Sequence, residues 1–568
     1  MRLRLVLVCC ALSLMVAGSA SATTLPFAAS SGALSLLLEN RTALKTTTAA
    51  PQKTTVTRAA AAVITPAPAF TSTDLSTVPG ANWLTNGGDV SNARYSSLNQ
   101  INTSNVANLK EAWHIHLDGS GMASKYSAEA TPIVYNGVMY ISQFNRIDAL
   151  DARSGNIVWQ YQRPPLTRTP QRGTAIFNNK LYVTAADGAL VAIDSRTGHT
   201  VWETKVAGPW RLAGQAPLVA KGKVIVSGNT PSGFIQAYDA ESGKYLWTWN
   251  AVPQKAGDPG SDTWAADSFK LGGGPVWVSG SYDPEQNAIF YGTGQPGSQW
   301  AGEVREGDNL YTDSIVAIDV DTGKIKWHFQ NTPHDVHDWD SLEMPVLIDV
   351  PFRGQSRKLL VQANRNGFYY ILDRTNGKFL MATPFVTRVN WASGLTAEGR
   401  PILNVGHEPS VEGSHTCPST AGATNWPSPA YNPDLNYFFL VAQEGCGLVM
   451  RTTDRPGAGG GYLESPKPEE AWQLYVRALD ATTGKKIWDY QQISSFHYGP
   501  GVLSTAGGLV FAGEHKGQIS ALDARTGKSL WHFNTGDLIT SSPISYAIDG
   551  QQYVAIASGG NILAFSMP

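Results

Sequence analysis

One short stretch of the chain concentrates the side chains that could do acid–base or metal chemistry. Residues 332–340 read Thr-Pro-His-Asp-Val-His-Asp-Trp-Asp, which places imidazoles and carboxylates close together. A carboxylate here could act as a general base if it lies within reach of the proton it takes. The same residue types often cap turns, and His334 with His337 could begin a zinc site. The segment alone leaves these three interpretations open.

Two arginines and one tryptophan also stand in local contexts that suggest binding. Arg172 lies in Gln-Arg-Gly, Arg365 in Asn-Arg-Asn-Gly, and Trp277 follows the run Gly-Gly-Gly-Pro-Val. A guanidinium stays charged and binds carboxylate or polarises carbonyl oxygens, and an indole offers a large flat face. The plain alternatives are a surface ion pair for Arg365 and a structural role for Trp277, because the chain has 17 tryptophans.

A repeated unit fills the chain and must position these side chains. Seven copies place a Trp, or once a Met, eight residues after an aspartate, and uninterrupted copies recur about every 43 residues. In each copy a strand leads to a turn that the aspartate caps, and a glycine such as Gly155 or Gly323 accepts positive φ there. The seven aspartates are Asp151, Asp194, Asp239, Asp319, Asp373, Asp480 and Asp523.

This repeat predicts an all-β fold. Four strands in about 43 residues make one blade of a β-propeller, and the repeated Trp can lie flat against the next blade. We expect eight blades, with seven as the alternative. The last strand, residues 561–566, looks like an eighth outer strand that lacks its turn, and we expect the N-terminal region to close the ring against it.

The repeat and the motifs resemble those of the pyrroloquinoline-quinone (PQQ)-dependent alcohol dehydrogenases, from about residue 83 to the C-terminus. Residues 87–96, Gly-Gly-Asp-Val-Ser-Asn-Ala-Arg-Tyr-Ser, match the opening stretch of that family. The resemblance implies that Asp338 is the general base and also approaches a metal ion. It further implies that Arg365 bonds the reactive quinone carbonyl and that Trp277 is the surface on which the cofactor ring stacks.

The same resemblance extends to supporting residues. Glu129, Arg172 and Asn425 fall at positions that contact the cofactor in the family. The separation of Cys417 and Cys446 agrees with a disulfide of family members, and two cysteines in an oxidising compartment most simply pair, although two free buried thiols remain the alternative.

The metal site departs from the family pattern. Where the family has a glutamate ligand, residues 227–233 here carry no carboxylate, and Gln295 stands where an Asn is usual. An acidic residue at position 340 is associated in the family with lanthanide use. We therefore expect Gln295, Asp338 and Asp340 to hold Ca²⁺ or a lanthanide in a depleted site. The family's adjacent cysteines are also absent near Arg168, which indicates a divergent branch.

The N-terminal residues predict export. Arg2 and Arg4 precede an apolar run and a small-residue site, which is typical of a signal peptide over residues 1–22. Residues 23–80 are rich in Thr, Ala and Pro and predict a disordered linker, and residues 81–568 predict the propeller domain. No segment is apolar enough for a transmembrane helix, and a net charge of −2 argues against nucleic acid as a partner.

The sequence therefore predicts a periplasmic or secreted quinoprotein dehydrogenase that oxidises an alcohol or sugar hydroxyl. It has no Cys-x-x-Cys-His for a covalent haem, so electrons would pass to a separate acceptor such as a soluble cytochrome c. Two alternatives stay open. One is a non-catalytic propeller that acts as a binding or assembly scaffold, and the other is a quinone-free hydrolase or lyase that uses His334 or His337.

Overall fold

The computed structural model describes residues 55–58, 71–117, 129–143, 146–164, 172–206, 211–212, 214–230, 232–494 and 499–568. The predicted signal peptide and most of the predicted linker lie outside these residues, as does Arg168. The described residues belong to one compact unit, Thr55–Pro568. Residues 55–58 form strand β1, and Leu75 is only 2% exposed. The folded part therefore begins before residue 81, where the sequence placed its start.

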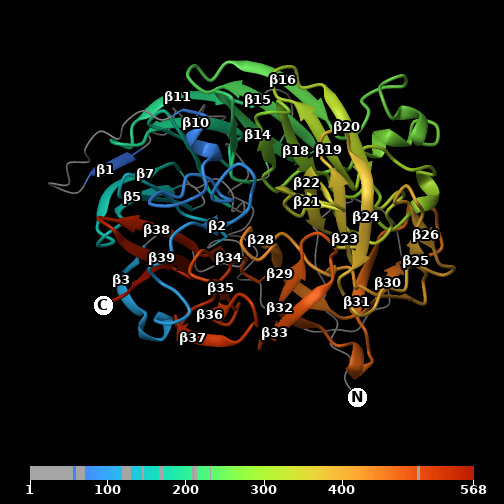
Figure 1. Cartoon of the computed structure of the whole chain (residues 1–568). Helices are drawn as coiled ribbons and strands as arrows, with labels where there is room; N and C mark the ends of the chain where they lie inside the picture. The colour runs from blue at the N-terminus through green and yellow to red at the C-terminus, as the bar shows by residue number, and fades with distance from the viewer. Residues whose placement is uncertain are drawn as a thin grey trace, which may run out of the picture. The chain divides into compact units, whose positions relative to one another are not determined.

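The regular secondary structure of the described residues is almost entirely β-strand (Figure 1). Eight of its sheets have four or five strands. Their strands, sheet by sheet, are β1 (Thr55–Arg58), β4 (Ile133–Tyr135), β5 (Val138–Gln143), β6 (Arg146–Asp151) and β7 (Ile157–Gln162); β8 (Ala175–Phe177), β9 (Lys180–Thr184), β10 (Ala189–Asp194) and β11 (Thr200–Lys205); β12 (Arg211–Leu212), β13 (Leu218–Ala220), β14 (Lys223–Thr230), β15 (Phe234–Asp239) and β16 (Tyr245–Asn250); β17 (Ser281–Asp283), β18 (Ala288–Gly292), β19 (Ser314–Asp319) and β20 (Ile325–Gln330); β21 (Val346–Phe352), β22 (Gln355–Ala363), β23 (Phe368–Asp373) and β24 (Lys378–Pro384); β28 (Ala430–Asn432), β29 (Tyr437–Glu444), β32 (Gln473–Asp480) and β33 (Lys486–Gln491); β2 (Tyr95–Ser96), β34 (Val502–Thr505), β35 (Leu509–Gly513), β36 (Gln518–Asp523) and β37 (Ser529–Asn534); β3 (Lys110–His116), β38 (Ile544–Ile548), β39 (Gln551–Ser558) and β40 (Asn561–Ser566).

Smaller elements decorate these sheets. The β25–β26 hairpin lies in the insertion between β24 and β28, and a three-stranded sheet joins β27 from that insertion to β30 and β31 from the insertion between β29 and β32. Short 3-10 helices connect several strands. The small strands are β25 (Ala392–Leu395), β26 (Pro401–Leu403), β27 (Ser414–Thr416), β30 (Gly447–Arg451) and β31 (Gly460–Glu464), and the 3-10 helices are η1 (Asp74–Ser76), η2 (Val106–Asn108), η3 (Ser261–Thr263), η4 (Ser268–Leu271), η5 (Gly302–Val304) and η6 (Pro468–Glu470). No helix in the described part is both long and apolar enough to span a bilayer.

The repeated turn forms as its sequence predicts. Asp319 Oδ1 accepts the backbone N–H of Thr322 over 2.9 Å, and Gly323 has a φ of 69°. The ring of Trp247, from the preceding sheet, lies directly against this glycine, because a Cβ there would sit 2.6 Å from the indole. The indole N–H of Trp247 donates to the carbonyl oxygen of Val320 over 3.0 Å. Each repeat is thus docked onto the turn of the next one.

The same contact recurs from sheet to sheet. An indole N–H donates to the carbonyl one residue beyond the next repeat's aspartate, as from Trp159 to Ser195 and from Trp488 to Ala524. Further indole N–H donors and their carbonyl acceptors are Trp113 to Ala152, Trp202 to Ala240, Trp327 to Arg374 and Trp531 to Leu109. In the copy that has Met381 in place of Trp, the hydroxyl of Tyr369 donates to the carbonyl of Ala481 instead.

The N-terminal and C-terminal parts of the unit share one sheet. Strand β3 pairs antiparallel with β40, as the sequence predicted for the N-terminal region and the last strand. The prediction that residues 561–566 form an outer strand was wrong. The strand β40 lies between β3 and β39, and β3, which carries Trp113, takes the edge position. The last copy lacks its turn because its outer strand comes from a distant part of the chain.

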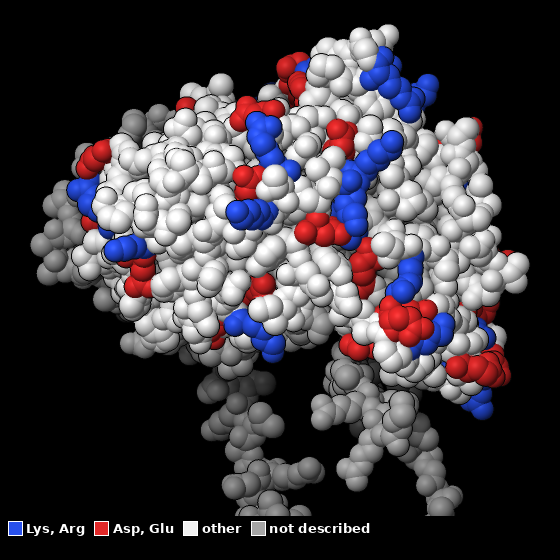
Figure 2. All heavy atoms as spheres, turned by 60° about the horizontal axis from the view of Figure 1, so that its bottom comes forward, with Lys and Arg blue, Asp and Glu red and all other residues white. Residues whose placement is uncertain are grey.

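On the face shown in Figure 2, basic and acidic side chains are interspersed, and neither sign gathers into one field. This agrees with 43 Lys and Arg against 45 Asp and Glu over the sequence. The residues that the sequence singled out lie in loops, some between successive sheets, as between β20 and β21, and others within one sheet, as between β22 and β23.

Candidate active site

The segment 332–340 joins β20 to β21 and folds around the side chain of Asp335. Asp335 Oδ1 accepts the N–H of His337, and its Oδ2 accepts the N–H of Trp339, each over 3.0 Å. Asp338 adopts a φ of 64°, a left-handed conformation that Asp tolerates better than most residues. Turn capping, one of the interpretations of this segment, therefore falls to Asp335 and leaves the carboxylate of Asp338 for another purpose.

The two histidines of this loop serve the structure. The Nδ1 of His334 bonds the carbonyl of Gly307 over 2.8 Å, and the Nε2 of His337 bonds the carbonyl of His407 over 2.7 Å. The ring of His337 also stacks on Trp339 at a centroid distance of 4.2 Å. Each imidazole is oriented by a different backbone carbonyl. This does not support the zinc interpretation of His334 and His337.

The loop brings Asp338 and Asp340 to the same buried place. Asp338 Oδ1 accepts from the side-chain amide of Gln299 over 2.6 Å. Asp340 accepts twice, from the indole N–H of Trp277 over 2.9 Å and from the backbone N–H of Gln295 over 2.8 Å. Burial raises the pKa of both carboxyls, and repulsion by Asp340 raises that of Asp338 further. Two buried like charges so placed favour a bound cation.

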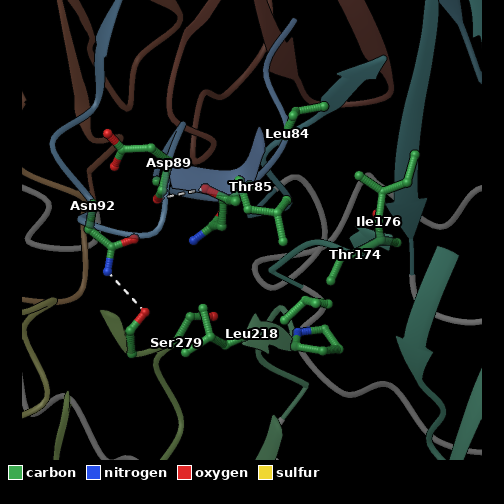
Figure 3. A pocket seen from close by; sticks show the side chains of 15 residues that line it. Leu84, Thr85, Asp89, Asn92, Thr174, Ile176, Leu218 and Ser279 are labelled. Atoms are coloured by element: carbon green, nitrogen blue, oxygen red, sulfur yellow. Dashed lines mark hydrogen bonds between the residues drawn. The ribbon is translucent and has the colours of Figure 1, made fainter. Parts of the chain in front are cut away.

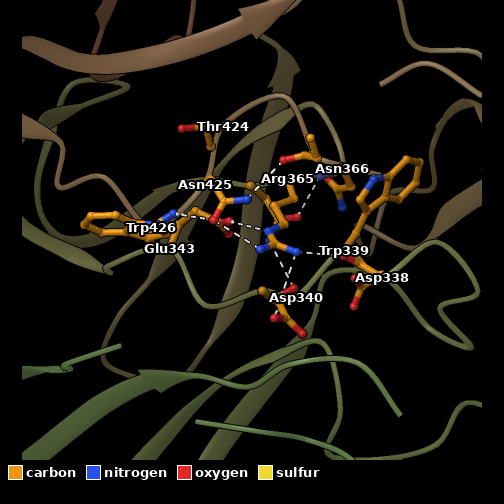
Figure 4. Close-up of polar contacts among 12 residues, drawn as sticks. Asp338, Trp339, Asp340, Glu343, Arg365, Asn366, Thr424, Asn425 and Trp426 are labelled. Carbon is orange, nitrogen blue, oxygen red and sulfur yellow. Dashed lines mark hydrogen bonds and ion pairs between the residues drawn. The ribbon is translucent and has the colours of Figure 1, made fainter. Parts of the chain in front are cut away.

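Arg365 follows β22 and reaches the same place from the opposite side (Figure 4). Its Nη1 donates to the backbone carbonyl of Asp338 over 2.7 Å and lies 3.9 Å from Oδ2 of Asp340. Its Nη2 donates to Oδ1 of Asn425 over 3.1 Å. The residue is only 7% exposed, so the surface ion pair considered for Arg365 is wrong. A Cβ at Gly422 would come within 2.7 Å of the arginine's Cγ, so this glycine makes room for the side chain.

Arg172 and Glu129 form a second buried pair beside Trp277. Nη2 of Arg172 lies 3.0 Å from Oε2 of Glu129, and its Nη1 donates to the backbone carbonyl of Trp277 over 3.3 Å. The guanidinium lies 4.9 Å from the ring centre of Trp277 and 5.2 Å from that of Trp426. Sequence reasoning did not single out Trp426, although its place directly after Asn425 was a usable signal.

The structure thus gathers the residues that the sequence singled out into two groups. Asp338, Asp340, Arg365 and Asn425 are joined by hydrogen bonds and ion pairs, and Trp277 links them to Arg172 and Glu129. Gln295 joins through its backbone. The predicted disulfide is confirmed, since Cys417 and Cys446 are bonded in the structure.

A small cavity lies beside the arginine–glutamate pair. Its lining includes Glu129, Arg172 and Trp426. A neighbouring narrow cavity, whose lining includes Thr174, shares Asn86 with it (Figure 3). Together they form a narrow space at Arg172 that is lined by polar side chains and by the indole of Trp426.

Buried polar atoms around this space lack partners. Among the described residues, Nε of Arg172, the hydroxyl of Thr174 and both amide atoms of Gln215 are buried without a hydrogen bond. Gln215 is 1% exposed and directly follows Gly214, whose carbonyl accepts the N–H of Arg172. Such atoms are costly to leave unsatisfied. The guanidinium groups of Arg172 and Arg365, the indole face of Trp277 and the unpartnered amide of Gln215 fit a flat, anionic, oxygen-rich cofactor. Neither Thr174 nor Gln215 could be singled out from the sequence.

The metal side of the site also has unsatisfied oxygens. The Oε1 of Gln295 is buried without a partner, and so are both carboxylate oxygens of Asp313, within the part of the chain that the structure describes. The stretch that lacks the family glutamate packs tightly, because a Cβ at Gly233 would lie 1.5 Å from the carbonyl oxygen of Gly274. Buried carboxylate and amide oxygens of this kind fit a hard cation that prefers oxygen ligands.

The fold and the site together define a β-propeller protein of the oxidoreductase class, whose buried arginines, indole and carboxylates fit a flat anionic cofactor and a cation. Residues 83–387 match the family described as "Glucose/ethanol/alcohol dehydrogenase, beta-propeller domain". The quinoprotein alcohol dehydrogenase PedH of Pseudomonas putida is 36% identical over 520 residues, which cover 84% of this chain and 86% of that protein. This chain belongs to the family of PQQ-dependent alcohol dehydrogenases, and the resemblance drawn from its motifs is confirmed.

Further comparisons agree. The quinohemoprotein alcohol dehydrogenase of Comamonas testosteroni is 36% identical in sequence over 84% of this chain and 72% of that protein. Its crystal structure superposes with a TM-score of 0.79 at 33% identity, and the superposition covers 87% of this chain and 83% of that one. A europium-containing methanol dehydrogenase superposes with a TM-score of 0.78 at 29% identity, covering 87% of this chain and 99% of that one. Residues 473–567 also match a family described as "Outer membrane protein assembly factor BamB".

Proposed function

We propose that this protein oxidises the hydroxyl group of an alcohol or a sugar, with PQQ as cofactor and Ca²⁺ or a lanthanide as metal. One observation carries the proposal. Asp338, Asp340, Arg365 and Trp277 converge in one buried site, where the indole donates to one carboxylate and the arginine holds the backbone of the other. A scaffold has no need for that combination.

The residues divide the chemistry among them. Asp338 takes the proton of the substrate hydroxyl at a carboxylate oxygen, acting as general base. Arg365 presents a permanent positive charge to the cofactor's reactive carbonyl. Trp277 provides the face on which the cofactor ring rests. When bound, PQQ supplies the electrophilic carbonyl that accepts the hydride.

Other residues bind and orient the cofactor. Arg172 pairs with its carboxylates and is itself held by Glu129, while Asn425 fixes the guanidinium of Arg365. The unpartnered amide of Gln215 and hydroxyl of Thr174 are further donors for its oxygen atoms.

The metal ligands are Asp338, Asp340 and the side-chain oxygen of Gln295. A cation bound there would offset the repulsion between the two buried carboxylates and would supply a Lewis acid beside the cofactor. The europium-containing relative, with which this fold superposes, supports a lanthanide as one occupant.

The architecture we propose is a closed ring of eight blades. Eight sheets of four or five strands in the described residues support this count. So does the chain of docking contacts, which returns from Trp531 to Leu109, just before β3 of the sheet that also holds β40. Residues 1–22 act as a signal peptide, residues 23 to about 54 as a linker, and the enzyme works in the periplasm or outside the cell. Electrons then pass to a separate acceptor, of which a soluble cytochrome c is one.

Reconstitution of the purified chain with PQQ and either Ca²⁺ or a light lanthanide tests the proposal. Reduction of an artificial dye, measured over a panel of alcohols and sugars, should depend on both the quinone and the metal. The Asp338→Ala variant should bind PQQ and reduce no dye. Absence of quinone binding with either metal would leave the ring as a binding or assembly scaffold, which is the outcome that the missing glutamate ligand favours.

A further inference from the structure

A buried glutamate that has no part in the proposed chemistry stands behind Arg365. Glu343 is 5% exposed and follows the catalytic loop just before β21. Its Oε1 lies 3.7 Å from Nε of Arg365. Figure 4 shows its carboxylate on the Nε side of the guanidinium, beside Asn425. The other oxygen, Oε2, has no hydrogen-bond partner in the described structure.

The backbone holds Glu343 in this place. The side-chain amide of Gln362, in β22, donates to the carbonyl of Glu343 over 2.7 Å and to that of Ser341 over 3.1 Å. Arg365 lies two residues after the end of the same strand, β22. Gln362 therefore links the position of Glu343 to that of Arg365. The contact is therefore built into the fold and does not depend on a flexible surface side chain.

The two terminal nitrogens of Arg365 bond neutral oxygen atoms, and Nη1 also lies near Asp340. Nη1 donates to a backbone carbonyl, and Nη2 donates to an amide oxygen. Glu343 faces Nε with an ionisable group. The parallel with Arg172 is close, since that arginine is likewise backed by a buried glutamate, Glu129, over 3.0 Å. In both pairs a buried acid orients a guanidinium that faces the cofactor space.

We propose that Glu343 is a positioning residue for Arg365, which fixes the guanidinium from the Nε side and sets how much of its positive charge acts on the cofactor. This inference rests on the proposed function, in which Arg365 acts on the quinone carbonyl. Glu343 touches neither substrate nor cofactor and acts only through the arginine.

The charge state of Glu343 gives the role a measurable signature. Burial raises the pKa of its carboxyl to about 8, although Arg365 opposes the shift. Below that pKa the carboxyl is neutral and Arg365 keeps its full charge, and above it the carboxylate offsets that charge. The charged groups that face Glu343 are Arg365 and, from its own loop, Asp340, while Asn425 and Trp426 beside it are uncharged.

PQQ affinity is the direct measurement. Purified full-length protein, with its metal, is titrated with PQQ by quenching of tryptophan fluorescence, at pH values on either side of that pKa. Wild type and Glu343→Gln should bind alike below it. Above that pKa wild type should bind PQQ up to about tenfold more weakly than Glu343→Gln does. This is the effect expected if the negative charge of bound PQQ raises the pKa of Glu343 by about one unit. Glu343→Ala should bind weakly throughout, because Arg365 loses its Nε contact.

A matched control separates this from a general effect of removing a buried acid. Glu514 is also buried with one oxygen unpartnered, and burial raises its pKa, but none of its contacts involves Arg365. Glu514→Gln should show the wild-type pH dependence.

The outcomes decide between the two proposals. The inference would be overturned if the ratio of the PQQ affinities of wild type and Glu343→Gln did not change with pH. A lower melting temperature of Glu343→Ala would not rescue it, because a merely structural role lowers stability alone. If Glu343→Ala does not fold, the isosteric Gln variant decides. Wild type that binds no PQQ at any pH would overturn the proposed function, and the inference with it.

Discussion

The indole nitrogen of Trp277 donates a hydrogen bond to Oδ2 of Asp340 over 2.9 Å. This contact joins the proposed stacking surface of the cofactor to a proposed metal ligand, so the two binding sites share one structural element. The ring of Trp277 in turn lies under the guanidinium of Arg172. A change at this tryptophan should therefore be felt in both cofactor and metal binding.

Trp277→Phe should weaken the binding of both the cofactor and the metal. Phenylalanine keeps an aromatic face but removes the N–H donor, and a hydrogen bond to a carboxylate contributes roughly 1.5–3 kcal/mol. We expect metal affinity to fall by about tenfold or more, with a smaller loss for PQQ. Fluorescence titrations with each ligand measure this. Trp488→Phe, which removes a docking indole in another sheet, should leave both affinities unchanged, and equal losses in the two variants would contradict the assignment.

Asp340→Asn should discriminate between metals. The substitution keeps an oxygen ligand but removes one of the two negative charges, and a trivalent ion depends on that charge more than Ca²⁺ does. Affinity for a lanthanide should fall more steeply than affinity for Ca²⁺, as measured by terbium luminescence and competition with Ca²⁺. Asp148→Asn, a buried aspartate paired with Arg146, is the control. Equal losses for the two ions would show that Asp340 does not set the preference.

Metal binding should strengthen as pH rises. In the metal-free protein, burial holds the pKa of Asp338 and of Asp340 above the ordinary value, so both carboxyls keep their protons to a higher pH. A cation must displace those protons, and its affinity therefore falls when pH drops through the raised pKa values. Lanthanide titrations over a pH series test this, and an affinity independent of pH would show that these carboxyls are not the ligands.

Arg172→Lys should impair cofactor binding while leaving the fold intact. A lysine keeps the charge but cannot form the paired contacts of a planar guanidinium or stack between Trp277 and Trp426 in the same way. We expect PQQ affinity to fall by roughly tenfold to a hundredfold. Turnover at saturating PQQ should change little, because Arg172 is placed in binding. A large loss of turnover at full occupancy would move Arg172 into the chemistry.

Removing the disulfide should lower stability without abolishing cofactor binding. Cys417 and Cys446 are 29 residues apart, and a cross-link closing a loop of that length contributes roughly 3–4 kcal/mol to folding. The double variant Cys417→Ser with Cys446→Ser should melt at a lower temperature. A melting temperature equal to that of wild type would mean that the surrounding insertion is held by other contacts.

The sequence by itself determined the all-β class, the docking repeat and the family. These follow from local patterns: an aspartate, a glycine and a Trp at fixed spacing encode one turn and one docking surface, wherever in the chain they occur. The individual residues Asp338, Arg365 and Trp277 could be chosen because each lies in a short motif that resembles one of the family, and Asn425 because the family resemblance extends to its position.

Only the tertiary structure decided which side chains meet. Nothing in the local sequence placed Glu343 against Arg365, Gly214 against the backbone of Arg172, or β3 outside β40, because each relationship joins loops or strands that are distant in the chain. Asp335 and Asp338 are equivalent as residue types, and the backbone turn alone makes one a cap and leaves the other available as a base. Burial, which depends on the whole packed environment, then raises the pKa of Asp338, whereas the hydrogen bonds that Asp335 accepts from His337 and Trp339 outweigh its burial and lower its pKa.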